Sequence, residues 1–257
     1  MPDTSLGAGA RPPLHIVACH QPNFFPWLGY FHKVRWAETF VVLDDALIQK
    51  TGGTVTNRTS LAPGGKQIWF TAPIDRSFSG TLPIDRARFS EREPFRERLL
   101  TTLRTTYSRS AHFSEVWSIV APLVEDPEPL LATYNTRAIT RIAEVLALPA
   151  KLMLSSSLGI EATSTERLVE IVNAVSGDTY LYGGGAKDYQ DDAQFFRRGI
   201  HLYEQGFRPP TYARGTQPEI AGLSILDALF FLGREGTRKL LDAPLPENGL
   251  RLAGGPA

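Results

Sequence analysis

Polar side chains that could act on a substrate follow directly after the first apolar segment of the sequence. Residues 14–30 read "LHIVACHQPNFFPWLGY" and place His20, Gln21 and Asn23 in a proline-rich turn, where each is a candidate substrate contact. A neutral imidazole both donates and accepts hydrogen bonds near neutral pH, so His20 could also act as a general base. The alternative, a turn histidine bonded only to the backbone, stays open.

The single cysteine, Cys19, is adjacent to His20 but is not expected to pair with it as a nucleophile. Successive residues of a strand point to opposite faces of the sheet, so we predict that Cys19 is a buried core residue. A lone cysteine also excludes an internal disulfide and a cysteine-rich metal site. This composition fits a reducing compartment, and we predict a cytoplasmic protein.

Two carboxylates, Asp44 and Asp45, end the apolar segment "TFVVLDD" at residues 39–45. Asp44 is a candidate catalytic group and Asp45 a candidate substrate contact. Because the two are adjacent, we expect them not to share one site. The five histidines are scattered and no carboxylate cluster has metal-ligand spacing, so we predict no metal site. An Mg²⁺ ion held through a substrate phosphate stays an open alternative.

Two further segments carry groups that could bind an anion. In "TNRTS", residues 56–60, Arg58 beside Asn57 could hold a carboxylate or phosphate through two hydrogen bonds, although a surface salt bridge is the simpler interpretation. In "GGGAKDY", residues 183–189, glycines would let backbone N–H groups approach a phosphate and Lys187 would add positive charge. That segment matches neither common nucleotide-binding signature, and a glycine-rich turn with a solvated lysine is the alternative.

The elements that must position these side chains alternate between short apolar segments and helical patterns. We predict strands at residues 14–19, 39–45, 66–74, 151–156, 179–185 and 201–205. Strands that alternate with helices form a parallel sheet covered on both faces, and ligands bind beyond the carboxyl ends of such strands. We therefore predict that one cleft is lined by His20, Asp44, Asn57, Arg58 and Lys187.

The proline-rich turn leads into a helix that begins near Pro26, a favoured first helical position. Trp27, Tyr30, Phe31 and Val34 then follow the spacing of one helix face. We predict that Trp27 and Phe31 are buried and anchor the turn, so that its polar side chains are held rigidly.

The length and composition fit one α/β domain. We predict this domain over residues 14–245, with Rossmann-like layers of helices on a mainly parallel sheet and a helical insertion or cap near 90–148. Residues 1–13 and 246–257 are expected to be loose tails. Basic and acidic residues number 27 each and no apolar segment approaches the length of a membrane span, so we expect neither nucleic acid nor a membrane as a partner.

Five segments, taken in their order, resemble the WbqC-like family of bacterial proteins over about residues 16–241. They are "HQPNFFPWLGYFHKV", "FVVLDD", "NR" at 57–58, "YGGGAKDY" and "LSILDALFFLG". The resemblance adds Gly184 and Tyr189 to the substrate-binding candidates and includes Asp227 among the motif residues. It implies an enzyme that tailors small molecules in O-antigen or other specialised biosynthesis, with aminoacyl transfer among the suggested activities. The chain departs from the family pattern at "TGG" before Asn57 and at Phe231, where the pocket could differ.

From these residues we expect an acyl- or aminoacyl-transferase that forms an amide on an amino sugar or an amino acid. No credible covalent nucleophile is present, so the amine would attack a thioester of CoA or of a carrier protein directly, with no tightly bound cofactor. His20 or Asp44 would accept the amine proton, and Asn57, Arg58 or loop N–H groups would stabilise the oxyanion. Two alternatives stay open: an ATP-dependent amide ligase or nucleotidyl-transferring enzyme, and a non-catalytic binding protein of a biosynthetic complex.

Overall fold

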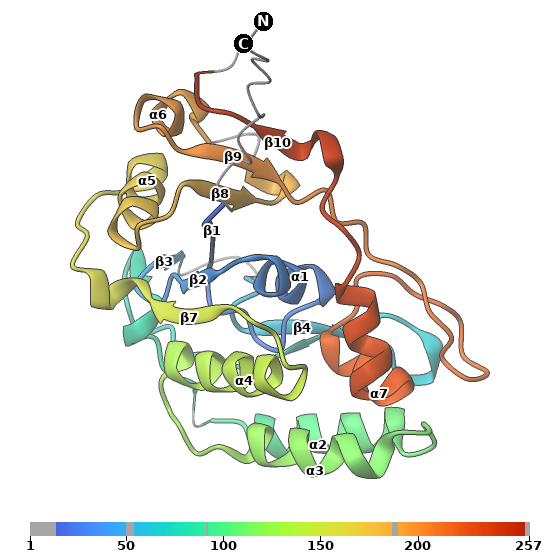
Figure 1. Ribbon diagram of the computed structural model, residues 1–257. Coiled ribbons are helices and arrows are strands. Elements are labelled where there is room, and N and C mark those ends of the chain that lie inside the picture. Colours follow the sequence, from blue (N-terminus) through green and yellow to red (C-terminus); the bar gives the residue numbers. More distant parts are fainter. Residues whose placement is uncertain (1–13, 50–53, 91, 187–189, 255–257) are drawn as a thin grey trace, which may run out of the picture.

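A mainly parallel sheet forms the centre of the protein, which confirms the predicted α/β fold (Figure 1). The computed structural model describes residues 14–49, 54–90, 92–186 and 190–254. The parallel strands are β1 (Ile16–His20), β2 (Thr39–Val42), β7 (Lys151–Leu154), β8 (Thr179–Tyr182) and β9 (His201–Glu204). They lie in the order β9, β8, β1, β2, β7, and β10 (Leu250–Arg251) pairs antiparallel with β9 at the edge.

The C-terminal part of the chain is more ordered than the sequence analysis expected. Residues 247–249 form a 3₁₀ turn that leads into β10, so the sheet includes residues beyond 245. Backbone hydrogen bonding to β9 explains this order, because a pairing partner for a short edge strand cannot be read from a local pattern. The expected N-terminal tail, residues 1–13, lies outside the described residues.

Helices cover both faces of the sheet and create two separate cores. Ala18 of β1 belongs to the larger core under α1 (Leu28–Trp36) and α7 (Ile225–Leu241). Its neighbours Val17 and Cys19 belong to the smaller core under α5 (Ser164–Ala174) and α6 (Asp192–Arg197). Burial on both faces explains why the central strands read as continuous apolar segments instead of alternating ones.

The predicted helical segment near 90–148 is present as three helices, shown in green at one end of the sheet in Figure 1. They are α2 (Phe95–Tyr107), α3 (Phe113–Glu125) and α4 (Leu131–Val145). The paired helices α2 and α3 pack against α7. No helix within the described ranges is both long and apolar enough to cross a membrane.

Two small hairpins lie outside the main sheet. One pairs β3 (Leu47–Gln49) with β6 (Thr81–Pro83), and the other pairs β4 (Arg58–Leu61) with β5 (Ile68–Thr71). The strand predicted at 66–74 is therefore β5, but it pairs antiparallel with β4 and does not join the parallel sheet. Its side chains explain the difference: Ile68 and Trp69 are exposed while Phe70 is buried, a pattern that a strand covered on both faces cannot have.

The order of the strands reverses between β1 and β8. From β1 the chain continues to β2 and β7 on one side, and from β8 it continues to β9 on the other side. In open parallel sheets, ligands bind at the carboxyl ends of the two strands that flank such a reversal. The residues that follow His20 and Tyr182 are therefore the ones expected to contact a ligand.

Candidate functional site

A buried lysine that the sequence analysis did not single out lies at this strand reversal. Lys33 of α1 is 8% exposed, and its Nζ would lie 3.5 Å from a Cβ built on Gly183, directly after β8. Among the described residues, none forms a hydrogen bond or an ion pair with the side chain of Lys33. Burial lowers the pKa of Lys33 to about 8. The sequence did hold a signal, because Lys33 falls three residues after Tyr30 and shares the buried face of the helix.

His20 lies at the end of β1 on the same side as α1. Its ring packs 4.8 Å from the ring of Tyr30, and Nδ1 lies 3.2 Å from the carbonyl oxygen of Gln21. A carbonyl can only accept, so Nδ1 carries the proton and Nε2 is an acceptor. Burial and the charge of Lys33 lower the pKa of His20 to about 3, which keeps the ring neutral near pH 7 but makes it a weak proton acceptor.

Gln205, directly after β9, faces the same glycine as Lys33. Its Nε2 donates to the carbonyl oxygen of Gly29 at 2.7 Å and lies 3.1 Å from Nδ1 of His32. His32 Nε2 bonds the carbonyl oxygen of Ala243 and so carries the proton, which leaves Nδ1 to accept from Gln205. Both hydrogens of the Gln205 amide are therefore donated. Its Oε1 lies 3.5 Å from a Cβ built on Gly183, and Lys33 Nζ lies at the same distance from that point.

Cys19 is buried on the opposite face of the sheet, as its position in the strand predicts. Burial raises the pKa of its thiol to about 12, against the smaller effects of Lys33 and Arg167. The thiol therefore stays protonated and is a poor nucleophile.

Asp44 and Asp45 both bond to the turn after β7, so the expectation that they do not share a site is wrong. Asp44 accepts from Ser155 Oγ at 3.2 Å and from Ser156 Oγ at 2.6 Å, while Asp45 accepts from Ser155 Oγ and pairs with Arg167. The alternation of a strand ends at Val42, so adjacent side chains after it can converge. Both carboxylates tie the end of β2 to the end of β7. Within the described ranges, no group of three or more His, Cys, Asp or Glu side chains could hold a metal ion.

The turn between β1 and α1 is pinned by side chains from distant elements. Phe25 has φ 41°, a strained conformation for a bulky residue, and its carbonyl oxygen accepts from Thr59 Oγ1 at 2.7 Å and from Ser224 Oγ at 2.8 Å. Asn135 of α4 donates to the carbonyl oxygens of Pro22 and Thr56. Strain of this kind persists only where the surroundings enforce it, and it concentrates at functional sites.

The aromatic residues of this turn differ in burial. Phe31 is fully buried, as predicted, but Trp27 is only partly buried, so the prediction for Trp27 is wrong. Its ring lies across Gly29, where an added Cβ would come within 2.1 Å of the indole, and beside Phe207 at 5.9 Å. The lack of a side chain at Gly29 therefore leaves room for the indole at the start of the helix.

Asn23 and Arg58 line a small cavity on the outer side of this turn, here called the corner pocket. Its volume is about 60 Å³, and Trp27 and Trp69 form part of its wall. Asn57 does not line it: its side chain donates to the carbonyl oxygen of Ala72 at 2.8 Å and supports the β4–β5 hairpin.

The predicted site residues are thus distributed over several places. His20, Gln21 and Gly184 lie at the strand reversal, Asp44 and Asp45 at the end of β2, and Asn23 and Arg58 in the corner pocket. The lining of the corner pocket includes none of His20, Asp44 and Asn57. Lys187 and Tyr189 lie outside the described residues, so a single cleft with all predicted members stays a prediction.

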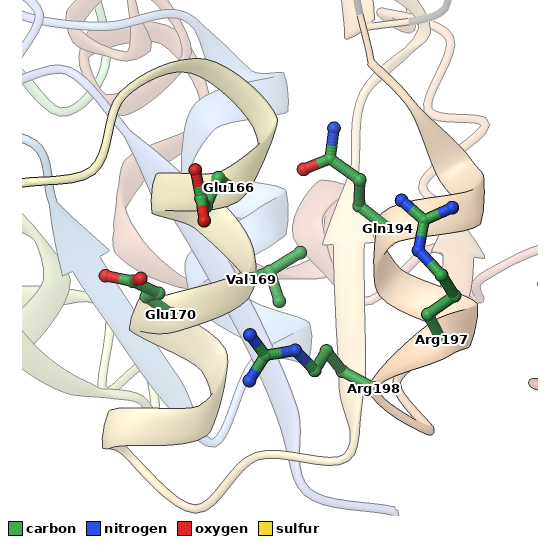
Figure 2. A pocket seen from close by; sticks show the side chains of 6 residues that line it. All are labelled: Glu166, Val169, Glu170, Gln194, Arg197 and Arg198. Carbon is green, nitrogen blue, oxygen red and sulfur yellow. The ribbon is translucent and has the colours of Figure 1, made fainter.

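A larger groove of about 330 Å³ lies between α5 and α6, away from these groups (Figure 2). The groove is lined by Glu166, Val169 and Glu170 of α5, by Gln194 and Arg197 of α6, and by Arg198, which follows that helix. No strand-end residue lines this groove, so its size alone does not mark it as the reactive site.

Comparisons with known proteins agree with the resemblance noted in the sequence. The model of the WbqC-like protein family matches residues 21–239. An uncharacterized protein of Mycobacterium tuberculosis, Rv1507c, is 28% identical over 237 residues, which cover 85% of this chain and 94% of the relative. No solved structure matches the chain.

Proposed function

This chain belongs to the WbqC-like protein family, and we propose that it is an enzyme that transfers an acyl or aminoacyl group from a thioester to an amino-bearing small molecule. One observation carries the proposal: a buried lysine whose side chain pairs with no group among the described residues faces the end of β8 at the strand reversal. A pKa of about 8 suits proton transfer to and from an amine near neutral pH. We place this chemistry in small-molecule biosynthesis in the cytoplasm, in line with the expectation from the sequence.

The proposed reaction is direct aminolysis. Nε2 of His20 accepts a hydrogen bond from the attacking amine and orients it, and neutral Lys33 accepts the proton that the amine loses. The new C–N bond forms as the C–S bond breaks, and the Lys33 ammonium returns the proton to the leaving thiolate. An acyl thioester and an amine thus become an amide and a free thiol.

The surroundings of Lys33 support direct attack over a covalent intermediate. The thiol of Cys19 has a pKa of about 12 and lies buried under the opposite helix layer. The acid–base role, which the sequence analysis gave to His20 or Asp44, passes to Lys33 in this scheme. Asp44 then has a positioning role, since Ser155 and Ser156 occupy its oxygens. CoA or a carrier protein would supply the thioester, and no tightly bound cofactor is invoked.

A second candidate function is an ATP-dependent amide ligase. It is favoured by the position of the glycine-rich turn 183–185 after β8, where a phosphate could approach the backbone and the Lys33 ammonium. In that case Lys33 would act as a charged group, and activity would fall as the pH rises through about 8.

Release of free thiol from a panel of acyl- and aminoacyl-CoA donors, with amino acids and amino sugars as acceptors, tests the proposal. We expect thiol release without ATP, with a rate that rises with pH to a plateau around an apparent pKa of about 8, because Lys33 must lose its proton first. Lys33→Met should lower the rate by roughly 10²–10⁴. Lys151→Met, at an exposed position of β7, is the matched control and should retain the rate.

Two outcomes would contradict the transferase, and a third would contradict the role of Lys33. Strict dependence on ATP with release of phosphate or pyrophosphate would identify the ligase. Binding of donor and amine without turnover would indicate a non-catalytic binding protein. Full activity in Lys33→Met would remove the lysine from the mechanism.

A further inference from the structure

The corner pocket contains two buried polar groups that no residue in the described part of the chain satisfies. Asn23 is 3% exposed and its Oδ1 has no hydrogen-bond partner. Nε of Arg58 is also buried without a partner, and none of the ion pairs among the described residues includes this guanidinium. Buried polar atoms in native proteins are nearly always bonded, so the exceptions need an explanation.

The other polar side chains of the pocket are already bonded within the protein. Thr59 and Ser224 donate to the carbonyl oxygen of Phe25, and Ser60 Oγ accepts from Gln67 Nε2 at 2.8 Å. The two unsatisfied groups are therefore not part of a generally loose region. They line one small space together with Thr59, Ser60 and Ser224, whose hydroxyl groups are bonded within the protein.

Arg58 is held in a form that suits a carboxylate. Its guanidinium stacks on the ring of Trp69 at 4.5 Å, and Trp69 remains 53% exposed. Stacking fixes the plane of the guanidinium and leaves its edge free to bind a planar anion through two hydrogen bonds. No carboxylate of the described residues occupies that edge.

Asn23 adds a requirement for a donor. Its buried Oδ1 accepts from no group among the described residues, and an amide oxygen can only accept, so its partner must be a donor. A ligand with an N–H beside its carboxylate would satisfy Oδ1 of Asn23 and the guanidinium of Arg58 together.

The size of the pocket restricts the ligand further. A volume of about 60 Å³ is a few times the roughly 10–15 Å³ that one water needs. It accommodates a carboxylate with one or two carbon atoms but not a sugar ring or a nucleobase.

We propose that the corner pocket binds the carboxylate and neighbouring N–H of an amino acid. That this amino acid is the acceptor of the acyl group rests on the proposed function, whereas binding of the carboxylate does not. Among the expected acceptors, the pocket thus favours amino acids over amino sugars.

The four tryptophans provide a test with internal controls. Trp27 and Trp69 line the pocket, whereas Trp36 and Trp117 do not. We expect alanine, and more weakly propionate, to shift saturably the ¹⁹F signals of 5-fluorotryptophan at positions 27 and 69. The signals of positions 36 and 117 should stay unchanged, and inorganic phosphate at equal ionic strength should shift none. Trp→Phe variants assign the signals.

Arg58→Met should weaken the binding of alanine at least about tenfold, because a charge-assisted bidentate pair is lost. If Arg58→Met does not fold, Arg58→Lys replaces it in the test. This second variant should also bind alanine more weakly than the unchanged protein, because lysine lacks the planar guanidinium with its paired N–H donors. The matched control is Arg104→Met, since Arg104 stacks on Trp117 at 4.9 Å outside the pocket. It should bind alanine like the unchanged protein.

No saturable shift at either pocket tryptophan up to about 100 mM alanine would overturn the proposal, since a charge-paired site should bind in the millimolar range or tighter. Unchanged affinity in both Arg58 variants, or equal shifts by phosphate, would also overturn it. A separate comparison of alanine with ethylamine as acceptors reports on the function. If the corner pocket binds the carboxylate but no thiol is released, the proposed binding site stands and the proposed transferase activity is wrong.

Discussion

Two buried cationic side chains of this protein, Arg214 and Lys33, have opposite surroundings. Arg214 has no exposed side-chain surface, and its guanidinium forms two hydrogen bonds with Asp227, at 2.9 Å and 2.7 Å. Tyr107 and Tyr212 donate to the same carboxylate, and Phe231 lies against the guanidinium at 5.1 Å. Lys33, by contrast, is 8% exposed and pairs with no carboxylate in the described ranges.

Under the proposed function, the contrast separates a structural charge from a reactive one. A buried ion pair whose hydrogen-bonding groups are all used holds its elements in one arrangement, here the segment before α7 against the helix itself. A buried charge without a partner destabilises the fold and persists where function requires it. Phe231, a departure from the family pattern, belongs to the first group because it packs on Arg214.

Removal of Asp227 should have the largest effect on stability. Asp227→Ala would leave the guanidinium of Arg214 buried and unpaired, together with two tyrosine hydroxyls, and should lower the free energy of unfolding by about 3–5 kcal/mol. Urea denaturation measures this change. The double variant Arg214→Met with Asp227→Leu should recover much of the loss, because apolar groups replace the pair. A loss below about 1 kcal/mol in Asp227→Ala would show that the cluster does not hold the fold.

Removal of the charge of Lys33 should act in the opposite direction. A pKa of about 8, against 10.5 in the unfolded chain, corresponds to about 3 kcal/mol of destabilisation at neutral pH. Because the unfolded state binds the proton more tightly, the stability of the unchanged protein should rise between pH 8 and 10.5. Lys33→Met should therefore be more stable at pH 7 by up to this amount, with a smaller difference at pH 9.5.

The measurement is thermal or urea unfolding at both pH values, with Lys151→Met as the exposed control. Equal stability of Lys33→Met and the unchanged protein at pH 7 would mean that Lys33 has an unrecognised partner. In that case the contrast with Arg214 would disappear.

Much of the fold follows from the sequence because its causes are local. The strand at 39–42 is buried on both faces, as a central strand of a covered parallel sheet requires, and its apolar side chains are visible in the sequence. The strand at 66–74 was expected in the parallel sheet but forms a hairpin, since pairing of β5 with β4 depends on contacts across a loop. The positions of β10 and of the bonds that pin Phe25 depend on residues far away in the sequence and could not be read locally.

The candidate site was less predictable than the fold for the same reason. His20 was found by its position at a strand end, which is a local feature. The surroundings of the Lys33 side chain include Gly183 and Gln205, which the sequence places more than 140 residues away. The shared use of Ser155 by Asp44 and Asp45 likewise arises from the neighbourhood of β2 and β7.

The third prediction concerns His20, whose pKa of about 3 lies below the ordinary value of 6.5. The unfolded chain binds a proton to this ring below about pH 6.5 and the folded protein does not, so stability should fall as the pH decreases from 6.5 towards 3. His20→Gln should lose less stability over this range, as measured by urea unfolding at pH 7 and pH 4.5. The effect should be smaller than that of Lys33 because the His20 ring is partly exposed. An unchanged pH dependence would mean that other groups control acid stability.

The smallest effect on stability is expected for Gly183→Ala, which tests whether the space around Lys33 matters more than its charge. A Cβ at this position would lie 3.4 Å from Cε and 3.5 Å from Nζ of Lys33, at ordinary contact distance. The variant should therefore fold with a change below about 1 kcal/mol in unfolding free energy. The added methyl group removes water from Nζ and should lower the pKa of Lys33 further. In thiol-release assays, the pH at which activity rises should move below that of the unchanged protein. Gly184→Ala, where a Cβ would meet no atom within 4 Å, is the matched control and should keep the original profile. If the two variants share one pH profile, the group that titrates during turnover is not Lys33.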